Sequence, residues 1–131
     1  MNAAQAAFGA GRRADGLALA AGALDAWAPL KDPHHLSLCL DGLAAGLAAH
    51  DAETAARLLG TCDRARDELG VELDELEQRL REIAIAELAE RLGEQRLAAC
   101  RRAGRDVTLD DAVAGVRTTL EGLQVRAYPG M

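Results

Sequence analysis

The sequence predicts an all-α fold, and three observations support that prediction. Apolar residues recur at helical spacing along most of the chain, and no segment alternates polar and apolar residues for long enough to indicate a confident strand. Hydrophobic residues make up 50% of the 131 residues, whereas aromatic residues make up 2%. Because the apolar side chains are mostly Leu and Ala, we expect helices that lie close together.

The first two predicted helices run from about Arg13 to Ala28 and from Pro33 to about Ala49. Pro29 ends the first, Asp32 is a suitable N-cap for the second, and Pro33 occupies its first position. Each helix carries an apolar stripe, with Leu17, Ala20, Ala21, Leu24, Trp27 and Ala28 on the first and Leu36, Cys39, Leu40, Leu43 and Leu47 on the second.

The third predicted helix begins after Asp51 and ends at Gly70, a residue typical of the position just past a helix. The short His50-Asp51 turn makes it antiparallel to the second helix. Its apolar stripe consists of Ala55, Leu58, Leu59, Cys62, Ala65 and Leu69.

A long charged helix follows, with an apolar seam of Leu73, Leu76, Leu80 and Ile83 that drifts to Leu88 and Leu92. Gly93 is predicted to end it. A short helix is expected around Leu97 to Ala103, with Gly104 as its stop and a run of arginines at its negative end, namely Arg101, Arg102 and Arg105.

The last predicted helix starts at Thr108. Together with Asp111 three residues later, Thr108 forms a pattern like that of a capping box. Its expected buried side chains are Leu109, Ala112, Val113, Val116 and Leu120. From Leu123 to Tyr128 the sequence indicates at most an extended tail.

The small residues between Leu36 and Asp67 loosely follow the tetratricopeptide pattern, at Gly42, Ala45, Gly46, Ala55, Leu59 and Cys62. An earlier stretch of the chain shows part of the same pattern, with Gly11-Arg12 at the position of the turn between two helices. We therefore expect a fragment of a right-handed α-solenoid, cut from a longer array. The expected organisation is a single helical-repeat domain over 1–131, with repeat-like hairpins over about 12–70, capping helices over 71–122 and a tail over 123–131.

Composition limits the classes of partner and the compartment that the sequence predicts. The formal net charge of −6 argues against a nucleic-acid partner, because phosphate binding needs an excess of Lys and Arg. No apolar run approaches the roughly 20 residues of a membrane span. The three cysteines lack CxxC spacing and no secretory segment opens the chain, so we expect a cytoplasmic protein.

The sequence disfavours a zinc site, a disulfide and a dinucleotide-binding site. His34, His35 and Cys39, with His50 or Cys62, have a spacing that could hold zinc, yet Cys39 lies on an apolar stripe and both histidines follow a helix start. A disulfide between Cys39 and Cys62 is equally disfavoured in a cytosolic protein. Gly9, Gly11 and Ala14 fit a loose dinucleotide fingerprint, but no strand precedes them.

Catalytic groups are sparse. Ser37 is the only serine, and no nucleophile with a base and an orienting group can be located. The acidic residues Glu72, Asp74, Glu75, Glu77 and Glu82 alternate with arginines, as on a solvated helix face. We therefore predict no enzymatic activity and no cofactor.

Two stretches resemble a known family. "AARLLGTCDRARDELG" at 55–70 and "LGEQRLAACRRAGRDVTLDDAVAGV" at 92–116, with a charged helix between them, resemble the C-terminal helical tail of actinobacterial multidomain ATPase-type transcriptional regulators (LuxR-like or SARP-like). Where the family has Phe and Trp, this chain has Leu97 and Arg101. The resemblance implies a tetratricopeptide-like tail of a transcriptional or signalling regulator.

The expected function is thus a non-catalytic interaction, sensor or oligomerisation module, which binds a protein, a peptide or other domains of the same regulator. If the repeats stack normally, its partner-binding groove is lined by Ser37, Leu40, Ala44 and Leu47. Two alternatives remain: a free-standing helical adaptor that homodimerises, and a small-ligand-binding helical protein.

Overall fold

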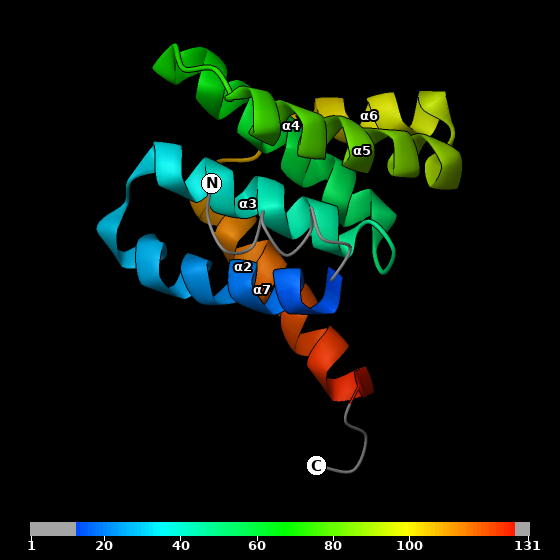
Figure 1. Ribbon diagram of the computed structural model, residues 1–131, viewed down its shortest axis with the longest axis horizontal. Coiled ribbons are helices and arrows are strands. Elements are labelled where there is room, and N and C mark those ends of the chain that lie inside the picture. Colours follow the sequence, from blue (N-terminus) through cyan, green and yellow to red (C-terminus); the bar gives the residue numbers. More distant parts are fainter. Residues whose placement is uncertain (1–12, 128–131) are drawn as a thin grey trace.

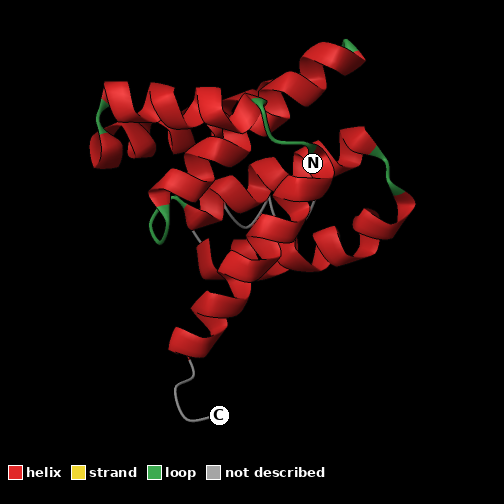
Figure 2. Ribbon diagram, turned by 180° about the vertical axis from the view of Figure 1, so that it is seen from behind, coloured by secondary structure: helices red, strands yellow, loops and turns green. Residues whose placement is uncertain are grey.

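The computed structural model describes residues 13–127, and this part of the chain is entirely helical (Figures 1 and 2). It contains six α-helices and one 3-10 helix, and no strand. The all-α prediction is therefore confirmed. The elements are α2 (Arg13–Trp27), η1 (Ala28–Leu30), α3 (Pro33–Leu47), α4 (Ala52–Leu69), α5 (Glu75–Leu92), α6 (Glu94–Arg105) and α7 (Leu109–Ala127).

The helices pack as a bundle in which α2, α3, α4 and α6 follow one another in space (Figure 1). The main core lies around α3 and α4, where Leu40, Leu43, Leu47 and Leu59 are at most 1% exposed. The predicted turn signals are confirmed at both ends of α4. Asp51 accepts a hydrogen bond from the Thr54 amide, and Gly70 adopts a φ of 67° while its amide bonds to the Arg66 carbonyl.

Two glycines allow α4 and α6 to approach closely. An added Cβ at Gly60 would overlap the Arg101 carbonyl, and one at Gly104 would overlap the Arg57 carbonyl. The Thr61 hydroxyl donates to the Gly104 carbonyl at 2.7 Å across the same contact. Gly104 was expected to end the short helix, but α6 continues through Arg105, so Gly104 acts as a packing residue inside the helix.

The orientation of α5 differs from the expected one. Leu76 and Ile83 of the predicted apolar seam are 36% and 55% exposed, whereas Ala84 and Leu88 are buried. The side chain of Arg81 is only 9% exposed and also points inward. The seam prediction was therefore wrong for Leu76 and Ile83 but right for Leu88, which is 0% exposed. The packed face differs from the expected one because buried ion pairs with other helices fix α5 through Arg81.

Helix α7 crosses α3 and α4 and is longer than expected. It extends to Ala127, so the extended tail predicted from Leu123 is helical up to that residue. Ala112 and Val116 are buried, while Leu109, Val113 and Leu120 are only partly buried. Its C-terminal end projects beyond the rest of the bundle in both views (Figures 1 and 2).

Some predictions fall on residues outside the described range. These are the Gly11-Arg12 turn and the dinucleotide-like pattern that includes Gly9 and Gly11, together with the end of the tail over 128–131. Within residues 13–127, no helix combines the length and the apolar character that a membrane crossing needs.

Candidate functional site

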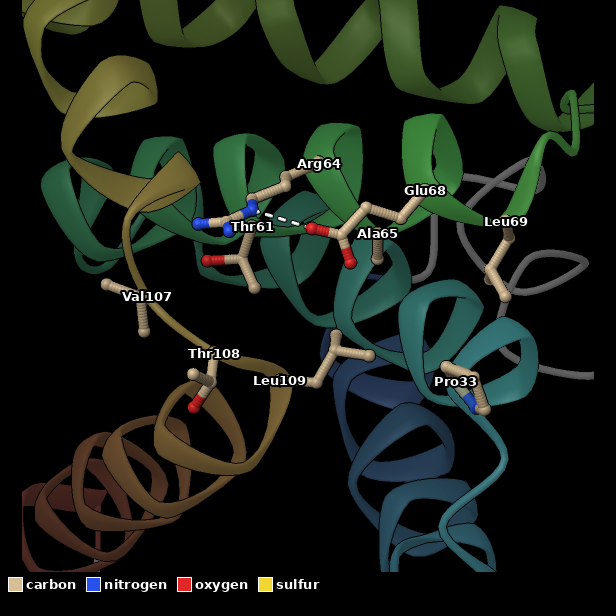
Figure 3. A pocket seen from close by; sticks show the side chains of 9 residues that line it. All are labelled: Pro33, Thr61, Arg64, Ala65, Glu68, Leu69, Val107, Thr108 and Leu109. Carbon is tan, nitrogen blue, oxygen red and sulfur yellow. Dashed lines mark hydrogen bonds and ion pairs between the residues drawn. The ribbon is translucent and has the colours of Figure 1, made fainter.

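A groove of about 450 Å³ opens where α3, α4 and the start of α7 meet (Figure 3). We call it the junction groove. Its lining comes from the first residue of α3, the C-terminal half of α4 and the connection from α6 to α7. The lining residues are Pro33, Thr61, Arg64, Ala65, Glu68, Leu69, Val107, Thr108 and Leu109.

Local capping signals place the walls of the junction groove. Asp32 caps α3 by accepting hydrogen bonds from the amides of His34 and His35 at 3.1 and 3.3 Å, which fixes Pro33 at the groove edge. Thr108 accepts from the Asp111 amide at 3.1 Å, which confirms the predicted start of the last helix. The two helix starts are joined by an ion pair between Lys31 and Asp110, at 3.0 Å.

The polar groups of the junction groove already have partners. Arg64 pairs with Glu68 at 2.8 Å and donates to the Arg105 carbonyl at 2.9 Å. The hydroxyl of Thr61 donates to a backbone carbonyl, and that of Thr108 accepts from a backbone amide. The remaining lining is apolar, so the groove suits an apolar side chain rather than a reacting group.

Leu69 is the most informative residue of this lining. It ends α4 and is 40% exposed, although it is a large apolar side chain at the edge of a concave surface. Figure 3 shows it at one end of the groove, across from Val107 on the connection that follows α6. The two apolar side chains lie at opposite ends of the groove, where side chains of a partner would bury apolar area against each.

The structure places the four predicted groove residues elsewhere. Ser37, Leu40, Ala44 and Leu47 are all 0% exposed, and Ser37 donates its hydroxyl hydrogen bond to the His34 carbonyl at 2.7 Å. They form part of the core and line no open surface. The expected partner-binding groove on these residues is therefore closed in this structure, because neighbouring helices cover the side of α3 that carries them.

A second candidate is a cluster of charged residues that joins α3, α4, α5 and α6. We call it the arginine–aspartate cluster, and its members are Asp41, Asp63, Arg66, Arg81 and Arg101. Asp41 contacts Arg66 at 2.5 Å and Arg81 at 3.3 Å. Asp63 contacts Arg81 at 2.6 Å and Arg101 at 3.0 Å.

The contacts of this cluster indicate a structural role. Arg81 also donates to the Leu59 carbonyl at 2.9 Å, so one side chain of α5 satisfies groups on two other helices. Burial is the largest influence on Asp41 and raises the pKa of its carboxyl, which Arg66 and Arg81 oppose. Burial likewise raises the pKa of the neighbouring Cys62 thiol well above its usual value. A protonated thiol is a poor nucleophile.

The residues weighed for zinc are not brought together. His35 bonds through Nδ1 to Asp32 at 2.9 Å and stacks on Trp27 with ring centroids 4.0 Å apart. Cys39 and Cys62 are buried free thiols, and burial raises the pKa of Cys39 as well. Within the described part of the chain, no group of three or more potential ligands could hold a metal ion.

Sequence reasoning missed the junction groove and the arginine–aspartate cluster. The sequence predicted Pro33 as a first helical residue and Leu69 as part of an apolar stripe, and it assigned Val107 no role. The helices bring these residues to one groove over long sequence separations. The one available signal for the cluster was the charge pattern, since Asp41, Asp63 and Arg66 interrupt otherwise apolar stripes.

Comparison with known proteins adds no further constraint. No protein-family model, curated protein or solved structure matches this chain. The functional argument therefore depends on the geometry of the chain itself.

Proposed function

We propose that this chain is a non-catalytic protein–protein interaction module, and that the junction groove is where it holds its partner. The observation that carries the proposal is the lining of the groove, in which apolar side chains stand beside charged and hydroxyl side chains that already have partners. Such a surface gains free energy by burying a partner's apolar side chain, and each polar side chain of its lining already takes part in a hydrogen bond within the chain.

The proposal extends to the larger protein. We propose a cytoplasmic transcriptional or signalling regulator of which this chain is a tetratricopeptide-like segment, with α3 and α4 as a repeat-like hairpin. Support comes from the buried glycines Gly42 and Gly46 on α3, from the Asp51 turn, and from the sequence likeness over 55–70 and 92–116. The thiols of Cys39, Cys62 and Cys100 are free, which suits a reducing compartment.

A photocrosslinking experiment in the source cell tests the interaction. The photoreactive residue p-benzoylphenylalanine replaces Leu69 in one variant and Leu19 in a matched control, because Leu19 is a similarly exposed leucine, at 44%, on α2. We expect a discrete protein adduct from position 69 and none from position 19. Adducts from neither position, or the same adducts from both, would contradict the proposed groove.

The mass of the native polypeptide tests the larger assignment. An immunoblot of source-cell lysate with an antibody to this segment measures it directly. A band several-fold heavier than 13.8 kDa supports the regulator, while a band at 13.8 kDa contradicts that part of the proposal and favours a free-standing adaptor.

A further inference from the structure

Helix α5 directs apolar side chains away from the bundle. Leu76 and Ile83 are seven residues apart, which places them two turns apart on one side of the helix. The partly buried Leu80 instead borders a hollow that α5 shares with Asp41 of α3 and Leu59 of α4. Ile83 is 55% exposed, the most exposed large apolar residue of α5. We call the strip formed by Leu76 and Ile83 the α5 outer face.

A shallow hollow continues this strip. It has a volume of about 440 Å³ and lies on the C-terminal half of α5, with Ile83 and Ala86 as its apolar residues. Its remaining lining consists of Glu87, Glu90 and Arg91. The outer face therefore offers both an apolar strip and a depression that could receive a side chain from a partner.

The charges along α5 and the segment that precedes it are mainly acidic, although Arg79 lies between Leu76 and Ile83 on the outer face. Among the exposed ionisable side chains from residue 72 to residue 92, five are acidic and two are basic. The acidic ones are Glu72, Asp74, Glu75, Glu82 and Glu90, and the basic ones are Arg79 and Arg91. Arg91 already pairs with Glu87 at 3.3 Å, which further reduces the positive charge available to an incoming molecule.

This charge pattern selects the kind of partner. A second copy of the chain would bring the same acidic border against the first, and like charges at an interface oppose association. A basic amphipathic helix matches both features, because its apolar stripe can cover the strip while its Lys or Arg side chains meet the acidic border. The outer face runs along a straight helix of 18 residues, which suits side-by-side helix packing.

We propose that the α5 outer face docks a basic amphipathic helix of a partner protein. This second surface lies on a different helix from those that line the junction groove, so the proposal holds or fails independently of the groove. It also accounts for a feature that the packing of the chain leaves unused, namely leucine and isoleucine side chains directed to solvent while Arg81 points inward.

Peptide binding to the purified full chain tests the proposal. The probe is a synthetic helical peptide of 18 residues, the length of α5, with Leu on one face and Lys on the other. The first control has Glu in place of Lys, and the second has the Leu and Lys residues in scrambled order. Fluorescence anisotropy should show binding of the amphipathic Leu/Lys peptide that weakens with added salt, little binding of the scrambled peptide, and none of the Glu peptide.

Variants locate the binding surface. The double substitution Leu76→Ser and Ile83→Ser should weaken binding by at least about tenfold, because the strip loses the apolar area that a peptide covers. Glu75→Gln with Glu82→Gln should weaken it less and reduce its salt dependence. Leu19→Ser is the matched control, since Leu19 is an exposed leucine on α2. Circular dichroism should show the same helicity for all variants.

Three results would overturn the proposal. One is equal binding of the scrambled and amphipathic peptides, and another is an equal loss of affinity for Leu19→Ser and for the α5 double variant. The third is a homodimer in sedimentation experiments that Ile83→Ser converts to a monomer, because a second copy would then cover the outer face. None of these results affects the crosslinking outcome at Leu69, so failure of the two proposals is distinguishable.

Discussion

Asp32 combines two roles at the start of α3. One carboxylate oxygen accepts hydrogen bonds from the backbone amides of His34 and His35. The other is hydrogen-bonded to Nδ1 of the His35 ring at 2.9 Å. The hydrogen bond from the His35 side chain is the largest reason why the pKa of Asp32 is lowered. The same ring stacks on Trp27, so one short segment joins the end of α2 to the start of α3.

This arrangement predicts a specific loss of stability in acid. A carboxyl with a lowered folded-state pKa contributes stability that is present above its ordinary value of 3.8 and is lost as the pH falls through the lower folded value. Asp32→Asn keeps a capping side chain but does not ionise. Urea unfolding between about pH 5 and pH 2 should therefore show a smaller acid-dependent loss for Asp32→Asn than for the natural chain.

His35→Ala provides the companion measurement, because it removes the largest cause of the lowered Asp32 pKa. Its acid-dependent loss should also be smaller, although its stability near neutral pH falls through the missing stack on Trp27. If both variants lost as much stability in acid as the natural chain, Asp32 would not be the responsible group.

At the scale of elements, helices in this chain pack by two different means. The pair α4 and α6 depends on the absence of side chains at Gly60 and Gly104, which lets two backbones meet. Helix α5 instead buries few apolar residues and is held through Arg81. Both means are compatible with a sequence that contains very few aromatic side chains.

Because Gly60 and Gly104 lie at the contact between α4 and α6 and Gly115 does not, a glycine-to-alanine substitution should change the free energy of unfolding in opposite directions at these positions. Gly60→Ala and Gly104→Ala should each lower the free energy of unfolding by about 1–3 kcal/mol or more, because the new methyl group would overlap a carbonyl of the other helix. Gly115→Ala should raise it by about 0.5–1 kcal/mol, since an added Cβ there meets nothing within 4 Å and alanine favours helix.

Chemical denaturation of the three variants measures these differences. Equal effects at positions 60, 104 and 115 would show that helix propensity, and not close packing of α4 on α6, decides the outcome. A loss confined to positions 60 and 104 would support the close approach of the two backbones.

At the scale of the whole molecule, the arginine–aspartate cluster connects four helices. Its two carboxylates come from α3 and α4, and its three guanidinium groups come from α4, α5 and α6. Because these side chains are mostly removed from water, the loss of one member leaves its partners partly uncompensated. The cluster thereby links the position of α5 to the core formed by α3 and α4.

Removal of Arg81 tests this link. Arg81→Met should lower the free energy of unfolding by about 3 kcal/mol, because Asp41, Asp63 and the Leu59 carbonyl each lose a donor in a buried site. Arg79→Met is the matched control on the exposed side of the same helix. Equal effects of the two substitutions in urea unfolding would contradict a structural role of the cluster.

The effect of Arg81→Met should also depend on pH. Burial raises the folded-state pKa of Asp41, and loss of Arg81 removes one of the two cations that oppose this rise. A carboxyl with a raised folded-state pKa contributes stability below its ordinary value of 3.8 that is lost as the pH rises through the folded value. The destabilisation should therefore be larger near neutral pH than near about pH 4.

The predicted elements and the observed ones agree where the signals are local. The starts of α3, α4 and α7 were predicted from Asp32, Asp51 and Thr108, and each of these residues makes the expected capping bond. Disagreement occurs where a residue has a distant partner. Gly104 was taken as a helix stop because nothing in its neighbours in sequence reveals the Arg57 carbonyl that it contacts.

The amino-acid sequence alone is enough to predict that the chain is helical and where most helices begin and end, because capping and helical periodicity depend on residues within a few positions of each other. Which face of α5 is buried, and where an apolar groove opens, becomes visible only once the helices have packed. Those outcomes depend on residues that are far apart in the sequence, such as Asp41 and Arg81, which form an ion pair, and Pro33 and Val107, which line the same groove. Their energies arise from burial and charge pairing after the helices have packed.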